Sequence, residues 1–321
     1  MKKRNHSIDI LKFICACIVI MLHTAFKWHD DIMPLTRCAV PCFFMISGFL
    51  LYSNQDSMQE RLKRNIRHIC HIILWSTLLF IGYKEMTSLV HGNFYVPSLE
   101  QWLCFIVLNE NPFVFHLWYL NAYLYVLIVM LAVDKYNLWI HMKWAAPSLL
   151  VLGNLLIYKY SVLIWDNPFV FRNFLFMGIP YFAIGAWCKN NNGRISAINR
   201  NIFGCGIILF AATSIIEENN LSLSSMPPMR EHYLSTPFLT VCLFLYVLSF
   251  KPERSSCISR MGEKDSLYIY VFHPLFTLTL PAVVYRMPSS INDCYQYTAP
   301  LIAFVLTIAF TITLRKTKLI A

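Results

Sequence analysis

The sequence has few charged residues. Only 14% of its 321 residues are Asp, Glu, Lys or Arg, compared with about 25% in an ordinary soluble domain. Hydrophobic residues make up 57% of the chain, and the mean hydropathy is +0.51. This composition excludes a soluble globular domain and predicts an all-α integral membrane protein.

Several patterns are absent. The eleven cysteines form no CxxC pair and no alternation with histidine, which excludes a disulfide or zinc framework. His68 and His71 have no acidic third ligand beside them, so we predict no metal site. The first apolar run is not followed by a small-residue cleavage site, so we expect it to be retained as a span. There is no internal repeat and no soluble domain at either end, so 1–321 is predicted to be one transmembrane domain.

Apolar stretches of about twenty residues predict the spans. We expect about ten helices, at 8–28, 36–52, 69–90, 115–133, 144–165, 169–188, 202–217, 236–250, 266–286 and 298–314. With the N-terminus inside, nineteen of the 27 Lys and Arg residues fall in cytoplasmic segments, while only Arg230 and Arg286 fall in external loops. The positive-inside rule thus predicts a multi-pass protein of the cytoplasmic (inner) membrane with both termini in the cytoplasm. Membrane lipid then accounts for the net charge of +10 without any nucleic-acid partner.

The first predicted helix carries three ionisable residues among its apolar ones, namely Asp9, Lys12 and His23. Each costs about 2.5 to 3.5 kcal/mol or more inside a bilayer, so such residues mark function by default. At about 100° per residue all three share one face, with Lys12 and His23 roughly 16 Å apart along the axis. Asp9 and Lys12 are i,i+3 neighbours, so we expect them to pair. The alternative is that Asp9 and Lys12 cap the helix at the membrane boundary while His23 snorkels outward. A histidine at this position can accept and return a proton near neutral pH.

Five stretches occur in order along the chain. They are the Asp9, Lys12, His23 segment; "VPCFFMISGFLLY" (40–52) followed by "RLKRNIRH" (61–68); "HLWYLNAYL" (116–124); "RNFLFMGIPYFAIG" (172–185); and "MGEKDSLYIYVFHPL" (261–275). With these motifs the chain resembles the acyltransferase 3 family, membrane-bound acyltransferases of cell-envelope glycans. The resemblance covers about 7–314 and implies one domain. The sequence departs from the family pattern at Lys12, where the family commonly has Arg.

The resemblance implies an enzyme that uses an acyl-CoA, most commonly acetyl-CoA, and no metal. The acceptor would be a hydroxyl of a surface glycan or a lipid-linked sugar. It also implies a catalytic group of His23, Lys12 and Asp9, in which His23 acts as general base or becomes transiently acylated. The CoA phosphates would meet a basic collar of Lys12, Arg61, Lys63, Arg64 and Arg67, although the positive-inside rule alone would also place the loop residues there. His273 would line the cofactor channel in the cytoplasmic half of its helix, or would serve packing.

The acceptor would be bound near the outer face. The residues expected there are His116, Trp118, Tyr119, Asn121, Arg172 and Glu217. For Trp118 the alternative is an aromatic belt at the interface. The alternative function is a polysaccharide or glycan exporter that uses the polar stripe as its pathway, although transporters often show repeated halves and none is found here. The oligomeric state, the acyl group and the acceptor are not predicted.

Overall fold

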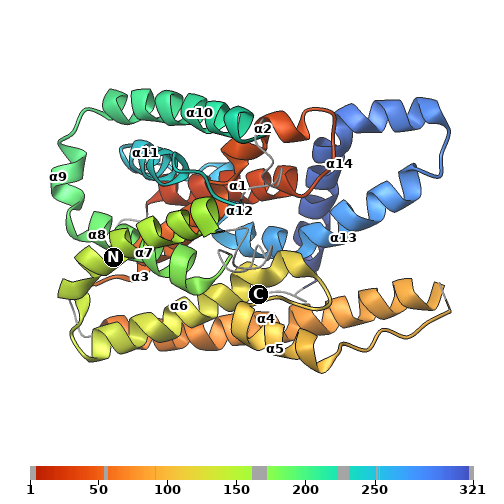
Figure 1. Ribbon diagram of the computed structural model, residues 1–321, viewed down its shortest axis with the longest axis horizontal. Helices are drawn as coiled ribbons and strands as arrows, with labels where there is room; N and C mark the ends of the chain where they lie inside the picture. The colour runs from red at the N-terminus through yellow and green to blue at the C-terminus, as the bar shows by residue number, and fades with distance from the viewer. Residues whose placement is uncertain are drawn as a thin grey trace. The chain divides into compact units, whose positions relative to one another are not determined.

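The computed structural model describes residues 5–53, 57–90, 92–160, 172–222, 231–250, 252 and 254–317 (Figure 1). All regular elements among these residues are helices, which confirms the predicted all-α class. The chain forms two compact units, here called unit 1 (Met1–Phe43 and Asn192–Ala321) and unit 2 (Phe44–Asn191). The prediction that these units make one domain stays a prediction.

Unit 1 is built around the first helix. Its elements are α1 (His6–Leu22), α2 (His29–Thr36), the start of α3 (Ala39–Leu51), α9 (Asn192–Ser196), α10 (Arg200–Ser222), α11 (Thr236–Leu248), α12 (Cys257–Lys264), α13 (Ser266–Val284) and α14 (Ser289–Lys316). Helix α1 packs against α12 and α13. A Cβ added to Gly262 in α12 would lie 1.7 Å from the Asp9 carbonyl oxygen. Only glycine therefore allows α12 to approach the start of α1 this closely.

Unit 2 holds the end of α3 together with α4 (Ser57–Val90), α5 (Leu99–Leu108), a 3-10 turn (Phe115–Leu117), α6 (Trp118–Lys135), α7 (Trp139–Tyr160), a π-helical turn (Phe174–Gly178) and α8 (Ile179–Asn190). Helices α3 and α8 cross at two glycines. A Cβ at Gly48 would lie 2.0 Å from the Phe182 carbonyl oxygen, and one at Gly185 would lie 2.0 Å from that of Met45. Backbone thus meets backbone at this crossing, as small residues permit between membrane helices.

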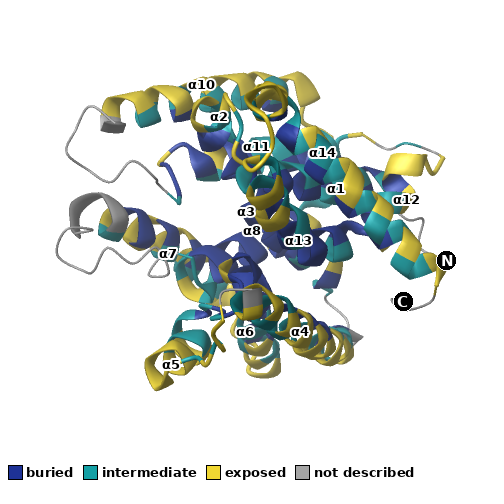
Figure 2. Cartoon of the chain, turned by 90° about the vertical axis from the view of Figure 1, so that its right-hand side faces the viewer, coloured by how far each residue is buried: buried dark blue, intermediate teal, exposed yellow. Residues whose placement is uncertain are grey.

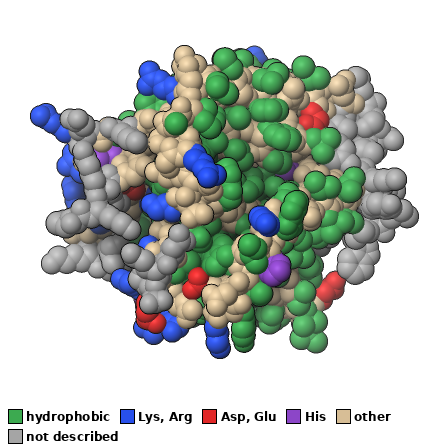
Figure 3. Space-filling view, turned by 90° about the vertical axis from the view of Figure 1, so that its left-hand side faces the viewer, with side chains coloured by type: hydrophobic (Ala, Val, Ile, Leu, Met, Phe, Trp, Pro, Cys, Tyr) green, Lys and Arg blue, Asp and Glu red, His purple; other side chains and the backbone are tan. Residues whose placement is uncertain are grey.

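Six described helices or helix pairs are long and apolar enough to span a membrane. They are His29–Leu51, Met58–Leu89, Phe115–Lys135, Arg200–Asn220, Ser266–Val284 and Ser289–Lys316. Hydrophobic side chains cover much of the face drawn in Figure 3, and α10 exposes much of its length in Figure 2. Only 11% of the most apolar window of α10 is buried. Outward-facing apolar side chains of this kind suit a lipid environment.

Several predicted boundaries were wrong. The expected helix 8–28 ends at Leu22, because His23 at its C-cap leaves the helical backbone conformation, with φ −106° and ψ 8°. The basic run 61–68, expected in a loop, lies in α4, and the expected helix 298–314 begins at Ser289 as α14. In both cases polar turns extend an apolar helix beyond its hydrophobic window. The predicted helices 144–165 and 169–188 fall partly in 161–171, outside the described residues.

Candidate active site

The start of α1 holds a half-buried ion pair. Lys12 Nζ lies 3.3 Å from Asp9 Oδ1, and the two side chains are 20% and 4% exposed. This geometry confirms the predicted i,i+3 pairing. Because Gly262 covers the Asp9 backbone, the carboxylate is fixed where α1 and α12 meet. The Lys12 ammonium is therefore held at a defined place and keeps some exposure to the surroundings.

The other end of α1 brings His23 against His273 of α13. Their rings are stacked, with centroids 5.3 Å apart and planes 20° from parallel. His273 is completely buried, whereas His23, the residue that follows the last turn of α1, is half-buried. The two histidines therefore lie side by side in unit 1, a contact that the sequence did not predict. His273 lies in the first half of α13, as expected, and its role in the cofactor channel stays a prediction.

Proline fixes the orientation of the His273 ring. Pro274 has no backbone N–H, so the Tyr270 carbonyl four residues earlier loses its usual helical donor. His273 Nδ1 lies 2.6 Å from that carbonyl oxygen. Since a carbonyl only accepts, Nδ1 carries the proton, and a neutral ring then has its lone pair on Nε2. The sequence "HP" thus holds the ring beside His23 in one tautomer.

A second ion pair lies where α12 meets α13. Asp265 is fully buried, and Arg315 Nη1 of α14 donates to both of its carboxylate oxygens at 2.6 Å. Ser266 Oγ donates to the Gly262 carbonyl at 2.8 Å. These bonds fix the start of the helix that carries His273. The sequence reasoning missed Asp265, although the residue stands inside the quoted "MGEKDSLYIYVFHPL" stretch.

The predicted acceptor residues of unit 2 are mostly buried. His116 is 3% exposed and stacks on Phe115 with ring centroids 4.0 Å apart. The Arg172 guanidinium lies over the same Phe115 ring at 5.9 Å. The structure therefore brings both His116 and Arg172 against the Phe115 ring, a juxtaposition that their separation in sequence did not reveal.

Three further predicted residues follow His116 on α6. Trp118, Tyr119 and Asn121 are each about 5% exposed, which excludes an aromatic belt for Trp118. Tyr119 packs edge-on against Phe44 at 4.9 Å. Asn121 Nδ2 is buried without a hydrogen-bond partner among the described residues. Acceptor binding by these residues stays a prediction, with Asn121 offering the inward polar group.

Glu217 has a structural task that the sequence did not suggest. Its carboxylate accepts bonds from the Leu234 N–H at 2.7 Å, the Ser235 N–H at 3.2 Å and the Ser235 hydroxyl at 2.9 Å. These bonds tie α10 to the chain that enters α11. Acceptor binding by Glu217 stays a prediction.

A buried ion pair of unit 1 was also missed. Arg37 Nη1 lies 3.1 Å from Glu231 Oε2, and both side chains are almost fully buried. Burial and the neighbouring Arg37 charge lower the pKa of the adjacent His232 to about 3, so this histidine is neutral at physiological pH. An arginine inside an apolar segment was the available signal, since it normally needs a partner.

The predicted arginine collar lies on α4 of unit 2. Arg61 Nη1 donates to the Leu50 carbonyl at 3.3 Å, while Arg64 and Arg67 are exposed. Their cooperation with Lys12 of unit 1 stays a prediction. Across the described ranges, no group of three or more His, Cys, Asp or Glu side chains could hold a metal ion.

Together, the apolar helices and the ionisable residues within them define an integral membrane protein with buried polar chemistry. The acyltransferase 3 family, described as "Acyltransferase domain", matches residues 5–314. The chain belongs to this family, as its motifs predicted. No solved structure matches it.

The curated relatives carry other names. The chain is 24% identical to the serine/alanine racemase of Enterococcus gallinarum over 331 residues, which is 96% of this chain and 45% of that protein. Two amino-acid racemases of Enterococcus faecalis are 23% and 25% identical, over 92% and 83% of this chain and 44% and 39% of theirs. The chain thus spans less than half the length of the curated relatives it matches.

Proposed function

We propose that the protein transfers an acyl group, most commonly acetyl, from acyl-CoA to a hydroxyl of a surface glycan or a lipid-linked sugar. The observation that carries this proposal is the stacked pair of His23 and His273 inside an acyltransferase family domain. Acyl transfer to a hydroxyl needs a group that takes up and returns one proton, and an imidazole does so near neutral pH.

We assign the proton transfer to His23 and a positioning role to His273. His23 is the more exposed ring of the pair, so it can meet substrate, whereas His273 is enclosed. The acceptor hydroxyl gives its proton to His23 while the hydroxyl oxygen bonds to the thioester carbonyl carbon. The C–S bond breaks, and the CoA thiolate leaves and takes that proton. The fixed face of His273 holds the His23 ring in place.

We assign donor contact to the Asp9–Lys12 end of α1. Lys12 offers an ammonium to the CoA phosphates, and its partial exposure supports this contact. We further propose about ten spans with both termini in the cytoplasm, so that donor enters from the cytoplasm and acceptor is modified near the outer face of the cytoplasmic membrane. The racemase activity named for the relatives is not assigned to this chain, because the chain spans less than half of them.

Purified protein in lipid nanodiscs tests the proposal. Incubation with acetyl-CoA should release CoA thiol faster than empty nanodiscs do, and a crude envelope-glycan extract should accelerate the release. A well-folded preparation that neither binds nor consumes acetyl-CoA would instead favour the exporter, which has no use for a thioester.

A further inference from the structure

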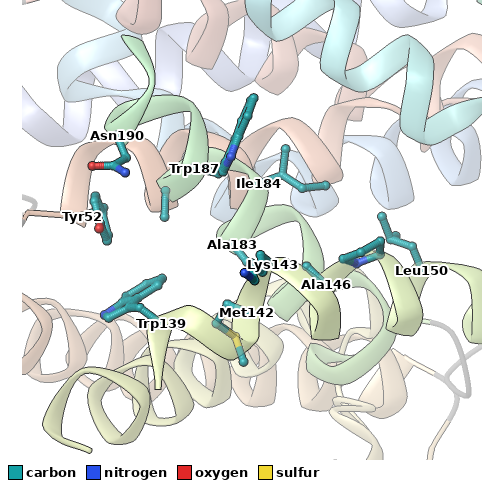
Figure 4. A pocket seen from close by; sticks show the side chains of 12 residues that line it. Tyr52, Trp139, Met142, Lys143, Ala146, Leu150, Ala183, Ile184, Trp187 and Asn190 are labelled. Atoms are coloured by element: carbon teal, nitrogen blue, oxygen red, sulfur yellow. The ribbon is translucent and has the colours of Figure 1, made fainter. Parts of the chain in front are cut away.

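Unit 2 contains a cavity that the proposed reaction does not use. It has a volume of about 370 Å³ and lies between α7 and α8, with Tyr52 after the end of α3 completing its wall (Figure 4). Its lining comes from described residues of unit 2 only.

The polarity of the cavity lining changes along its length. Tyr52, Trp139 and Asn190 lie at one end, and Leu150 lies at the other, as Figure 4 shows. Ala146 and Ala183 form the floor between them. On α7 the distance from Lys143 to Leu150 is about 10 Å. The cavity is therefore polar at the helix ends and apolar toward the middle of the helices.

The polar end resembles a membrane interface. Trp139 packs edge-on against Tyr52 at 4.9 Å, and its indole N–H donates to Asp134 Oδ1 at 3.0 Å. Trp187 is 56% exposed beside it. Tryptophan and tyrosine gather where membrane helices meet the headgroups, with the ring in the apolar layer and the polar edge outward.

The charge around the cavity is positive on balance, because three nearby lysines outnumber the Asp134 carboxylate that accepts from Trp139. Lys143 is exposed and lines the cavity, and no Asp or Glu is among the lining residues. Lys135 and Lys189 stand at neighbouring helix ends. Basic pockets between membrane helices attract anionic headgroups, at about fivefold in affinity for each lysine near the surface.

We infer that this cavity binds one anionic phospholipid. Its phosphate contacts Lys143 and Asn190, and part of an acyl chain lies over Ala146 and Ala183 toward Leu150. A soluble phosphate would leave the apolar floor uncovered, whereas a phospholipid fills both parts. The site is separate from His23 and His273, and the inference does not rest on the proposed enzyme activity.

Native mass spectrometry of protein from mixed nanodiscs tests the inference. The nanodiscs contain equal phosphatidylglycerol and phosphatidylcholine of the same chain length. Wild-type protein should retain one phosphatidylglycerol with about fivefold preference. Lys143→Gln should reduce the preference to about one, while the matched Lys316→Gln, which removes an exposed lysine at the end of α14 in unit 1, should keep it.

A second variant separates a cavity from a charged surface. Ala146→Phe fills the floor and leaves Lys143 in place, so it should lose the retained lipid of either headgroup. Retention of the anionic preference in Lys143→Gln, or equal retention of both lipids by the wild type, would overturn the inference. Unchanged lipid retention in a folded Ala146→Phe protein would show that any preference comes from the surface and would equally overturn it.

Discussion

Each unit contains a histidine stacked on another ring, but the two partners differ. In unit 1, His23 stacks on His273, a second imidazole whose orientation is fixed by the Tyr270 carbonyl. In unit 2, His116 stacks on Phe115, a ring without a proton to give, and Arg172 covers the same ring. The first arrangement suits proton transfer, and the second suits recognition by a fixed charge. The following predictions test that division, beginning with the largest effect.

Replacing His23 should have the largest effect. His23→Ala removes the proposed proton acceptor and should lower acetyl transfer by about a hundredfold or more. The substitution makes the chain more apolar, so membrane insertion should be unchanged. The measurement is transfer from acetyl-CoA in membranes that contain equal amounts of each protein. A matched His116→Ala, which leaves unit 1 intact, should retain more activity; the reverse order would contradict the division.

Loss of the fixed orientation of the His273 ring should have the second-largest effect on acetyl transfer. Pro274→Ala introduces a backbone N–H that competes with His273 Nδ1 for the Tyr270 carbonyl, so the ring loses its fixed position. We expect transfer to fall by about tenfold, which corresponds to about 1.4 kcal/mol of transition-state stabilisation. Pro281→Ala is the matched control. It removes the other proline of α13 and leaves the contact between His273 and the Tyr270 carbonyl in place. Equal rates for both variants would show that the proline matters only for helix shape.

His273 itself can be tested for its role. His273→Phe keeps an aromatic ring beside His23, whereas His273→Leu does not. If His273 positions His23, the Phe variant should retain severalfold more activity than the Leu variant at equal abundance. If His273 were the base, both would be equally inactive. Initial transfer rates at saturating acetyl-CoA distinguish the two outcomes.

Replacing Lys12 should affect only the use of the acyl-CoA donor. Lys12→Gln should raise the apparent KM for acetyl-CoA by about tenfold, since one charged contact to phosphate is lost. Lys12→Arg should remain close to wild type, because Arg is common there in the family. Lys135→Gln is a suitable control, as Lys135 is an exposed lysine at the end of α6 that is not assigned to the donor. An unchanged KM in Lys12→Gln would return Lys12 to the role of helix cap.

The smallest effect is expected for Arg172. Arg172→Gln should raise the apparent KM for the acceptor severalfold and leave the acetyl-CoA KM unchanged, because its charge lies against Phe115, on which His116 stacks, and not at the donor end of α1. The apparent acceptor KM of Arg172→Lys should lie between that of the wild type and that of Arg172→Gln. A change in donor KM of similar size would remove the distinction between the units.

The sequence predicted the helical class, the Asp9–Lys12 pair and the family, because these depend on composition, helical spacing and ordered motifs. It did not predict that His23 meets His273, since their contact depends on the packing of α1 on α13, which sequence distance does not encode. Burial of Trp118 and Tyr119 was also missed. An apolar aromatic pattern near a helix end looks the same whether the neighbour is lipid or another helix.

The proposed acyl transfer is tested most directly by analysis of the envelope glycans of the producing cells. Cells with wild-type protein, with His23→Ala at equal abundance, or with no protein are compared by mass spectrometry of their surface glycans and lipid-linked sugars. We predict a species heavier by one acyl group, labile to mild base, only with the wild-type protein. The same acylated species in all three samples, or in the His23→Ala cells at the wild-type level, would contradict the account.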